Sequence, residues 1–297
     1  IANGEESPLL VEPEWQSVFM PDCGQTAWAR TICMQFEGAW AALTSVIVDK
    51  VGLYGYEVET HLLRAGGTMP VVMTVEPLAR SKILSIHSPF QLRNETTRPI
   101  DCTFRVEAGL LRAGASAALS APQSSLLLPD HDSYLPLSAG AGGHLKIQAH
   151  NYSTADKDVI QVGLGEDVNL HEQQGIIACG PTFEGGSSFH CCLELKKENI
   201  KLFGSDKQRT GRAGQGESRQ GRPKAYSSGG TIRNVGSLWY HTLSLVPPIV
   251  MQNLLPYPIT ITVSEQHQPE ACQEYRIQPG ESTHIYNFDM NHKIRMS

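Results

Sequence analysis

Hydrophobic and polar residues alternate with a period of two along several short stretches of the chain. The clearest is Pro258 to Val263, where isoleucines and a valine alternate with threonines. Such alternation indicates a strand with one buried face. Similar runs rich in Val, Ile, Thr and aromatic residues are Thr44 to Val51, Val71 to Val75, Leu145 to Gln148 and Val159 to Val162. Helical periodicity is almost absent, so the pattern predicts an all-β fold of β-sandwich-like modules.

One segment of the chain occurs twice, with an offset of 159 residues. Residues 84–104 and 243–263 are identical at 7 of 21 positions without a gap, where chance gives about one or two. The apolar positions of the two copies also keep the same phase, although a slip of one residue would turn every core side chain to solvent.

A second, weaker similarity follows each copy, at residues 126–133 and 275–283. Both segments have the pattern of a strand, a proline turn and a return strand. The chain is therefore predicted to contain two tandem β-modules. We assign residues 1–39 to a leading segment, for which the end of a preceding module is one interpretation, residues 40–143 to module one and residues 144–297 to module two.

Each copy has an asparagine at the same place, Asn94 in the first and Asn253 in the second. It ends an apolar strand, four turn residues follow, and Pro99 or Pro258 begins the alternating strand. A carboxamide both donates and accepts hydrogen bonds, and Asn tolerates a left-handed backbone, so Asn suits such a corner. These four residues are predicted to form a structural turn, with support of a peptide site as an additional role.

Residues 204–230 break the pattern, because they are mostly Gly, Arg, Gln, Ser and Lys. Such a composition cannot form a core and predicts a disordered insertion within module two. Residues 201–224 contain seven Lys or Arg and two acids. One interpretation is a basic tether for RNA or for anionic lipid headgroups, with lipid contacts at Arg209, Arg212, Arg219 and Arg222. The basic residues are dispersed, which favours a solvated loop.

The net charge of −6 shows no overall basic field, so nucleic acid is not expected as a partner. The seven cysteines form no Cys-x-x-Cys pair, which favours a reducing, cytosolic setting. Sequons at Asn94 and Asn151 keep a secreted alternative open. The chain begins at Ile1 without a signal region, and we expect it to be a piece of a longer protein.

Enzymatic motifs are not found in the sequence. It has no Gly-x-Ser-x-Gly elbow, no His-Glu-x-x-His and no P-loop, so we expect no catalysis, cofactor or metal. The tightest polar cluster, residues 130–132, has the composition of a metal site but is predicted to be the tip of a hairpin. Trp40 and Trp239 are predicted to anchor the core rather than to stack on sugars.

The second copy reads Leu-Ser-Leu-Val-Pro-Pro-Ile-Val-Met-Gln-Asn-Leu-Leu-Pro-Tyr-Pro-Ile from residue 243. This resembles the recurring signature of the vacuolar protein sorting-associated protein 13 family of bridge-like lipid transfer proteins. The resemblance is to its adaptor-binding region, also described as the SHORT-ROOT-binding-type domain, in which tandem β-modules each carry such an asparagine. Residues 45–52 are similar to a segment near a module's start, so the resemblance spans residues 40–297. The first copy lacks the Leu-Pro-Tyr, and the insertion has no counterpart in the family pattern.

This resemblance implies a non-enzymatic receptor that is cytoplasmic and peripheral at organelle membranes and contact sites. Its modules would capture short proline-containing segments of organelle adaptor proteins and so position the lipid-conducting rod. Open sheet edges suit this role, since an extended peptide can add to them as a strand. The rival hypotheses are a secreted carbohydrate- or matrix-binding β-sandwich array and a hydrolase on a β-scaffold. The choice of adaptor and organelle stays open, as does whether these modules hold the peptide site.

Overall fold

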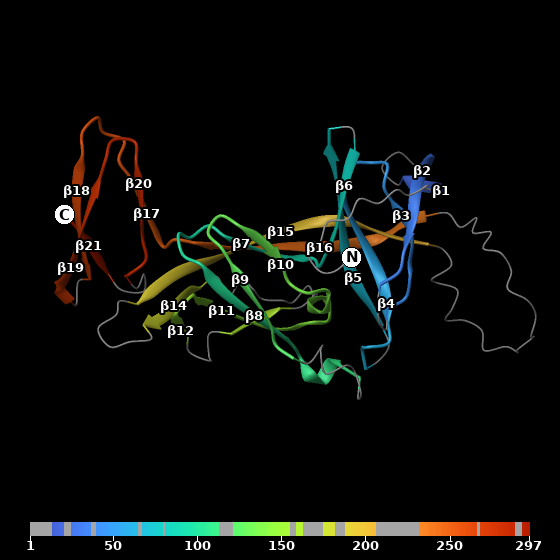
Figure 1. Cartoon of the computed structure of the whole chain (residues 1–297), viewed down its shortest axis with the longest axis horizontal. Helices are drawn as coiled ribbons and strands as arrows, with labels where there is room; N and C mark the ends of the chain where they lie inside the picture. The colour runs from blue at the N-terminus through green and yellow to red at the C-terminus, as the bar shows by residue number, and fades with distance from the viewer. Residues whose placement is uncertain are drawn as a thin grey trace, which may run out of the picture. The chain divides into compact units, whose positions relative to one another are not determined.

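The computed structural model describes residues 14–20, 25–36, 40–64, 67–79, 81–112, 121–154, 159–162, 175–181, 188–205, 232–265, 268–288 and 293–297. Within these residues the chain consists of strands and two short 3-10 helices (Figure 1). The predicted stretches fall on strands except at residues 48–51 and Pro258, which lie outside them. The prediction of an all-β fold of sandwich-like modules is confirmed. The predicted insertion lies outside the described residues, apart from Gly204 and Ser205, which end a strand.

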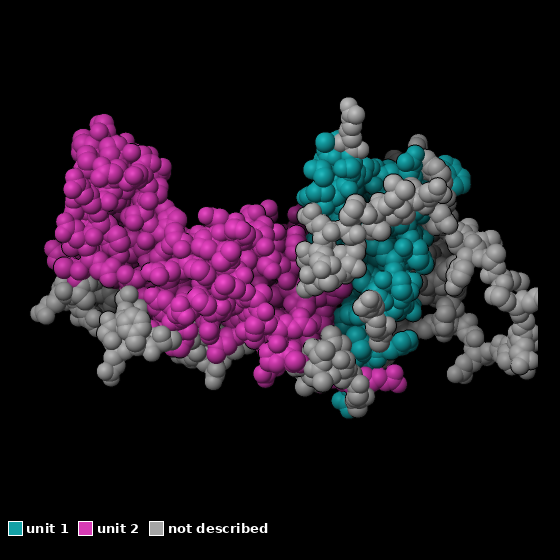
Figure 2. Space-filling view, viewed as in Figure 1, with its two compact units in different colours: residues 1–87, 199–239 teal, residues 88–198, 240–297 magenta. Residues whose placement is uncertain are grey.

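Two compact units emerge from the contacts along the chain, residues 1–87 with 199–239 and residues 88–198 with 240–297 (Figure 2). They are discontinuous because two long strands, β15 (Phe189–Ser205) and β16 (Ile232–Val246), contribute to both. The module boundaries predicted after residues 39 and 143 follow the sequence repeat instead, and they stay a prediction.

Unit 1 is built mainly from antiparallel hairpins. Its strands, besides parts of β15 and β16, are β1 (Glu14–Met20), β2 (Gln25–Met34), β3 (Leu43–Ile47), β4 (Gly52–Thr60), β5 (Gly67–Leu78) and β6 (Ser81–His87). Strand β5 is its buried centre, since Val71, Val72, Met73 and Val75 are fully buried. The buried Tyr56 hydroxyl accepts the Ile47 N–H at 3.0 Å, and burial raises the pKa of this tyrosine.

Unit 2 contains both copies of the sequence repeat. Its elements are β7 (Phe90–Asn94), β8 (Ile100–Val106), η1 (Ala108–Leu110), β9 (Gln123–Leu127), β10 (Asp132–Tyr134), η2 (Leu137–Ala141), β11 (Gly143–Ala149), β12 (Tyr152–Thr154), β13 (Val159–Val162), β14 (Ile176–Pro181), β17 (Ile249–Gln252), β18 (Ile259–Glu265), β19 (Gln268–Ile277), β20 (Ser282–Ile285) and β21 (Ile294–Met296). We call β7 to β10 copy one and β17 to β20 copy two.

The two copies pair their strands in the same register. Ile100 lies opposite Leu127 between β8 and β9, and Ile259 lies opposite Ile277 between β18 and β19. Likewise Arg93 lies opposite Asp132 between β7 and β10, and Gln252 lies opposite Ser282 between β17 and β20. The sequence repeat is therefore a structural repeat of two strand pairs.

Each copy packs its two strand pairs around a separate apolar cluster. In copy one, Phe90 and Leu92 of β7 share a core with Ile100 and Phe104 of β8. In copy two, Val263 of β18 packs with Ile285 of β20 and with Phe288. The alternation noted in the sequence supplies these inward-facing side chains, because successive strand residues point to opposite faces.

Candidate docking site

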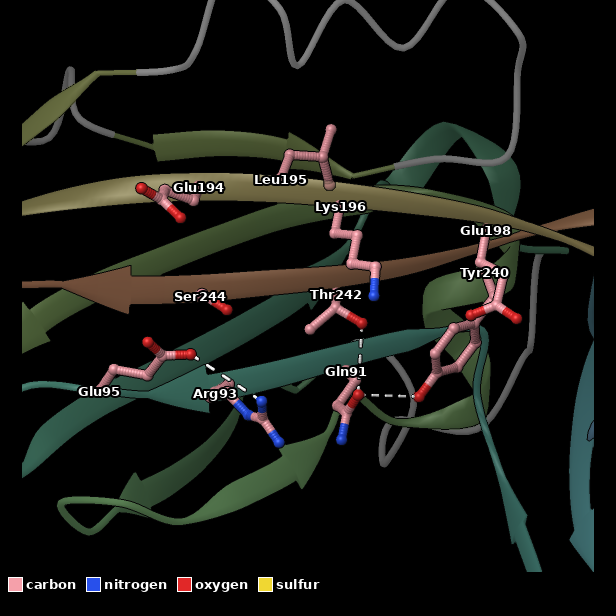
Figure 3. Close-up of a pocket in the computed structure, with 10 residues that line it drawn as sticks. All are labelled: Gln91, Arg93, Glu95, Glu194, Leu195, Lys196, Glu198, Tyr240, Thr242 and Ser244. Carbon is pink, nitrogen blue, oxygen red and sulfur yellow. Dashed lines mark hydrogen bonds and ion pairs between the residues drawn. The ribbon is translucent and has the colours of Figure 1, made fainter.

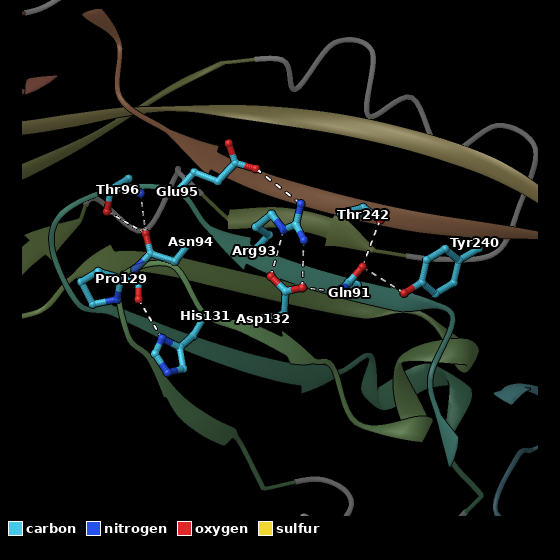
Figure 4. Close-up of polar contacts among 10 residues, drawn as sticks. All are labelled: Gln91, Arg93, Asn94, Glu95, Thr96, Pro129, His131, Asp132, Tyr240 and Thr242. Carbon is cyan, nitrogen blue, oxygen red and sulfur yellow. Dashed lines mark hydrogen bonds and ion pairs between the residues drawn. The ribbon is translucent and has the colours of Figure 1, made fainter. Parts of the chain in front are cut away.

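The side chain of Asn94, at the end of β7, is fully buried. Its Nδ2 donates to the carbonyl oxygens of Arg98, at 2.8 Å, and Leu127, at 3.1 Å. Its Oδ1 accepts from the Thr96 N–H at 3.0 Å and from the Thr96 hydroxyl at 2.7 Å (Figure 4). The carboxamide thus connects the turn after β7 to the end of β9.

Asn253 repeats this arrangement in copy two. Its Nδ2 donates to the carbonyl oxygens of Tyr257, at 2.9 Å, and Ile277, at 3.0 Å, and its Oδ1 accepts the Leu255 N–H at 3.0 Å. The two asparagines therefore bond equivalent backbone groups at equivalent places. Pro99 is half-buried and Pro258 is exposed at the start of the next strand. Support of a peptide site by these four residues stays a prediction.

In each copy, the turn between the last two strands contains a residue with a left-handed backbone. Asp130 has φ 56° and its equivalent, Gly280, has φ 77°. The Asp130 N–H donates to the Asn94 carbonyl at 2.8 Å, and the Gly280 N–H donates to the Asn253 carbonyl at 2.8 Å. Gly or Asp is suited to this place because both tolerate the left-handed region.

We expect Gly280→Ala to lower the free energy of unfolding by about 1 kcal/mol, since a Cβ is strained at positive φ. A Cβ at Gly280 meets no atom within 4 Å, so the backbone alone carries the cost. Gly109→Ala is the matched control, because its Cβ also meets nothing within 4 Å and its φ is not positive. Urea denaturation measures the free energy of unfolding of both variants. An equal loss in the two would contradict the proposed strain at residue 280.

The copies differ at one edge of the strand that ends in asparagine. In copy one, β7 lies between β10 and β16, and β16 runs parallel to it. The Glu95 N–H donates to the Leu245 carbonyl and the His241 N–H to the Pro89 carbonyl, each at 2.8 Å. In copy two, β17 pairs with β20 alone among the described strands. Within the part of the chain that the structure describes, its second edge is therefore open, whereas the same edge of copy one is occupied.

Exposed apolar side chains gather beside this open edge. Val250 is 53 % exposed, Leu254 81 %, Leu255 45 % and Tyr257 58 %, and we call these four residues the turn patch. The equivalent residues of copy one are all polar, namely Gln91, Glu95, Thr96 and Arg98. Clustered apolar exposure of this kind marks interaction sites in soluble proteins.

A separate polar groove of about 420 Å³ lies across β7, β15 and β16 (Figure 3). Gln91 Oε1 accepts from the Tyr240 hydroxyl at 3.0 Å and from the Thr242 hydroxyl at 3.3 Å. Burial raises the pKa of Tyr240, and the Coulomb effect of Tyr134 adds to it. The groove is lined by charges of both signs, so it singles out no ligand chemistry.

Arg93 in this groove pairs with Asp132, with 2.9 Å between Nε and Oδ1 (Figure 4). That hydrogen bond raises the pKa of the guanidinium. Asp132 thus belongs to an ion pair at the start of β10, and His131 Nδ1 lies 2.7 Å from the Pro129 carbonyl oxygen. Residues 130–132 lie at the turn between β9 and β10. The prediction of a hairpin tip is wrong, because β9 pairs with β8 and β10 pairs with β7, so the two strands belong to different sheets. No cluster with metal-binding composition occurs among the described residues.

Other predicted residues lie elsewhere. Arg209, Arg212, Arg219 and Arg222 fall outside the described residues, so lipid contact there stays a prediction. Trp40 is partly buried and packs on Phe36, with ring centroids 6.4 Å apart. The prediction of a core position is wrong for Trp239, which is 38 % exposed, because it alternates with buried Leu238 and Tyr240 along β16 and therefore takes the solvent face.

Three of the described cysteines, Cys102, Cys179 and Cys191, are buried. Burial raises the pKa of Cys102 to about 12 and also raises that of Cys191. These thiols therefore behave as small apolar core residues. The Asn94 sequon is buried too, so the folded chain offers no acceptor for glycosylation there.

The site residues predicted from the sequence include neither the open edge of β17 nor the turn patch. A signal for the patch was nevertheless available, because Leu254-Leu255-Pro256-Tyr257 stands where copy one has Glu95-Thr96-Thr97-Arg98. No sequence signal identified the open edge, since it depends on which strand pairs with β7.

Comparison with protein families matches residues 221–297 to the family described as Vacuolar-sorting associated protein 13, adaptor binding domain. No curated protein matches the chain. The matched residues include copy two with its asparagine turn, open edge and turn patch. The resemblance predicted from the repeat is thereby confirmed for the C-terminal part of the chain: residues 221–297 match the adaptor binding domain of the vacuolar-sorting associated protein 13 family.

Proposed function

We propose that this chain is part of the adaptor-docking region of a bridge-like lipid transfer protein and binds short proline-containing segments of organelle adaptor proteins. The role is binding rather than catalysis. The observation that carries the proposal is the open edge of β17 in copy two, whose equivalent in copy one holds an added strand. Such an edge accepts an extended peptide through main-chain hydrogen bonds.

The turn patch supports the same role through side chains. A peptide on β17 would reach Val250 on the strand and the exposed residues of the turn that follows. Proline rings pack well on exposed aromatic surfaces, and Tyr257 supplies one. Proline is also tolerated wherever a peptide's N–H would face away from β17, because no ladder bond is lost there.

Docking of this kind would hold the protein at organelle membranes and contact sites as a peripheral component. Among the described residues, no helix has the length and apolarity to span a membrane. The rival hypothesis, a secreted carbohydrate-binding array, gains no support from the first sequon, since Asn94 is buried.

Titration of the chain with fluorescent proline-containing peptides tests the proposal. We expect dissociation constants on the order of micromolar, because a flexible peptide is ordered over a small area. Raising the salt concentration should change them less than about threefold, since main-chain bonds rather than charges carry the contact. Binding that disappears in high salt would assign the contact to the basic insertion, and no binding by any peptide would contradict the proposal.

A further inference from the structure

Copy one already holds an extended segment at the edge that is open in copy two. Residues 241–245 of β16 lie parallel to residues 90–94 of β7, with His241 opposite Phe90 and Leu245 opposite Asn94. The His241 ring also stacks on Phe90, with centroids 5.0 Å apart. This pair shows how the module binds a strand.

Alternate residues of this strand have different roles. His241, Leu243 and Leu245 are buried, whereas Thr242 and Ser244 line the polar groove. In a parallel pair, one residue directs both its N–H and its C=O to the same neighbour. The His241 N–H and the Leu245 C=O bond to copy one, so residues 241, 243 and 245 form the bonded set.

A second contact in copy one is polar and lies at the turn. The Tyr286 hydroxyl accepts the Thr97 N–H at 2.8 Å, and its ring stacks on Phe189 with centroids 4.8 Å apart. The residue equivalent to Thr97 in copy two is Pro256, which has no N–H to donate. The equivalent residue of copy two therefore cannot donate such a hydrogen bond, and the turn presents apolar side chains instead.

From these differences we infer that copy two binds an extended apolar segment that runs parallel to β17 and packs on the turn patch. This inference rests on the proposed function and adds the direction, register and side-chain pattern of the ligand. The ligand's first residue lies opposite Ile249 and its fifth opposite Asn253, as in copy one. Its first N–H donates to the Pro248 carbonyl, and its fifth carbonyl accepts the Leu254 N–H.

The pattern of the ligand follows from the residues that flank it. Its second residue lies beside Val250, where copy one pairs Thr242 with Gln91. An apolar side chain is therefore favoured at the second position, in addition to the third and fifth. The fourth lies beside Gln252 and tolerates a polar residue. Apolar residues after the fifth extend onto Leu254, Leu255 and Tyr257.

The probe for this inference is a fluorescein-labelled synthetic peptide with the sequence of residues 239–246 and the substitution Thr242→Val. We expect it to bind the full chain, and to bind at least about threefold tighter than the peptide without the substitution. N-methylation at its Leu243 position should weaken binding about tenfold, since one main-chain hydrogen bond is lost. The matched control is N-methylation at its Ser244 position, whose N–H faces away from β17, and we expect less than a twofold change, about the error of the assay.

Substitutions in the turn patch of the chain test the same contact. Leu254→Asp and Tyr257→Asp should each raise the dissociation constant of the probe about tenfold. Arg98→Asp is the matched control in copy one, and it should leave binding unchanged. All three side chains are exposed, so thermal melts should show intact folds.

A photo-crosslinker at either end of the probe tests direction. In the parallel arrangement, the crosslinker at the C-terminal end labels Leu254 or its neighbours, and the one at the N-terminal end labels residues near Pro248. Reversed labelling, or a probe that binds the two Asp variants as tightly as the wild type, would overturn the inference.

The same assay separates this inference from the proposed function. Proline-containing peptides that bind the wild type and both Asp variants equally would leave the proposed function standing and overturn the inference. Probe binding at the open edge that such peptides do not compete for would support the inference and count against the proposed function. A chain that binds no peptide contradicts both.

Discussion

Asn94→Ala is expected to lower the free energy of unfolding by about 3 kcal/mol, because it leaves buried backbone groups of the turn and of β9 without their partner. Four hydrogen bonds end at this side chain, which is fully buried. Asn253→Ala removes three such bonds from a more exposed turn, so we expect about 2 kcal/mol there.

Urea denaturation of the full chain measures both losses. Asn287→Ala is the control, since the Asn287 side chain makes one bond, to Gln273 Oε1 at 2.8 Å, and its loss should be below about 1 kcal/mol. Asn94→Asp should be at least as harmful as Asn94→Ala, because a buried carboxylate would face two carbonyl oxygens. Unchanged stability together with lost peptide binding would contradict the structural role of these asparagines.

Tyr286→Ala is expected to destabilise the chain by about 3 kcal/mol, in the range of large-to-small core substitutions. Tyr286 is 8 % exposed, belongs to the same apolar cluster as copy one and stacks on Phe189. Its hydroxyl also accepts the Thr97 N–H. The residue after β20 therefore stabilises the turn of copy one, and its removal weakens copy one more than copy two.

Tyr286→Phe separates the two contributions, since it keeps the ring and removes the hydroxyl, and we expect a loss of about 1 kcal/mol. Tyr257→Ala is the control in the turn of copy two. Its ring is 58 % exposed, so we expect a change below about 0.5 kcal/mol. Equal losses for Tyr286→Phe and Tyr286→Ala would place the whole effect in the hydroxyl and contradict the importance of stacking.

Period-two alternation predicted several of the strands, as at residues 258–263, which contain most of β18. The repeat likewise predicted that Asn94 and Asn253 occupy equivalent turns, and their hydrogen bonds are equivalent. Both features are local, because a turn and the strand after it are specified by residues a few positions apart. Features of this local kind were therefore predictable without the structure.

The structure was needed for every feature that depends on distant pairing. Residues 241–245 pair in parallel with residues 90–94, and the sequence of neither stretch predicts this pairing. That pairing decides which edge of copy one is filled, and its absence among the described strands leaves the edge of β17 open. The position of Trp239 was predicted wrongly for the same reason, since only the assembled sheet determines which face meets solvent.

The sequence by itself thus determined the all-β class, the repeat and the asparagine turn, because alternation and turn chemistry act among residues a few positions apart. Only the tertiary structure decided which edge is free and where apolar side chains stay exposed beside it. These depend on hydrogen bonds between segments some 150 residues apart, which leave no local pattern in the chain.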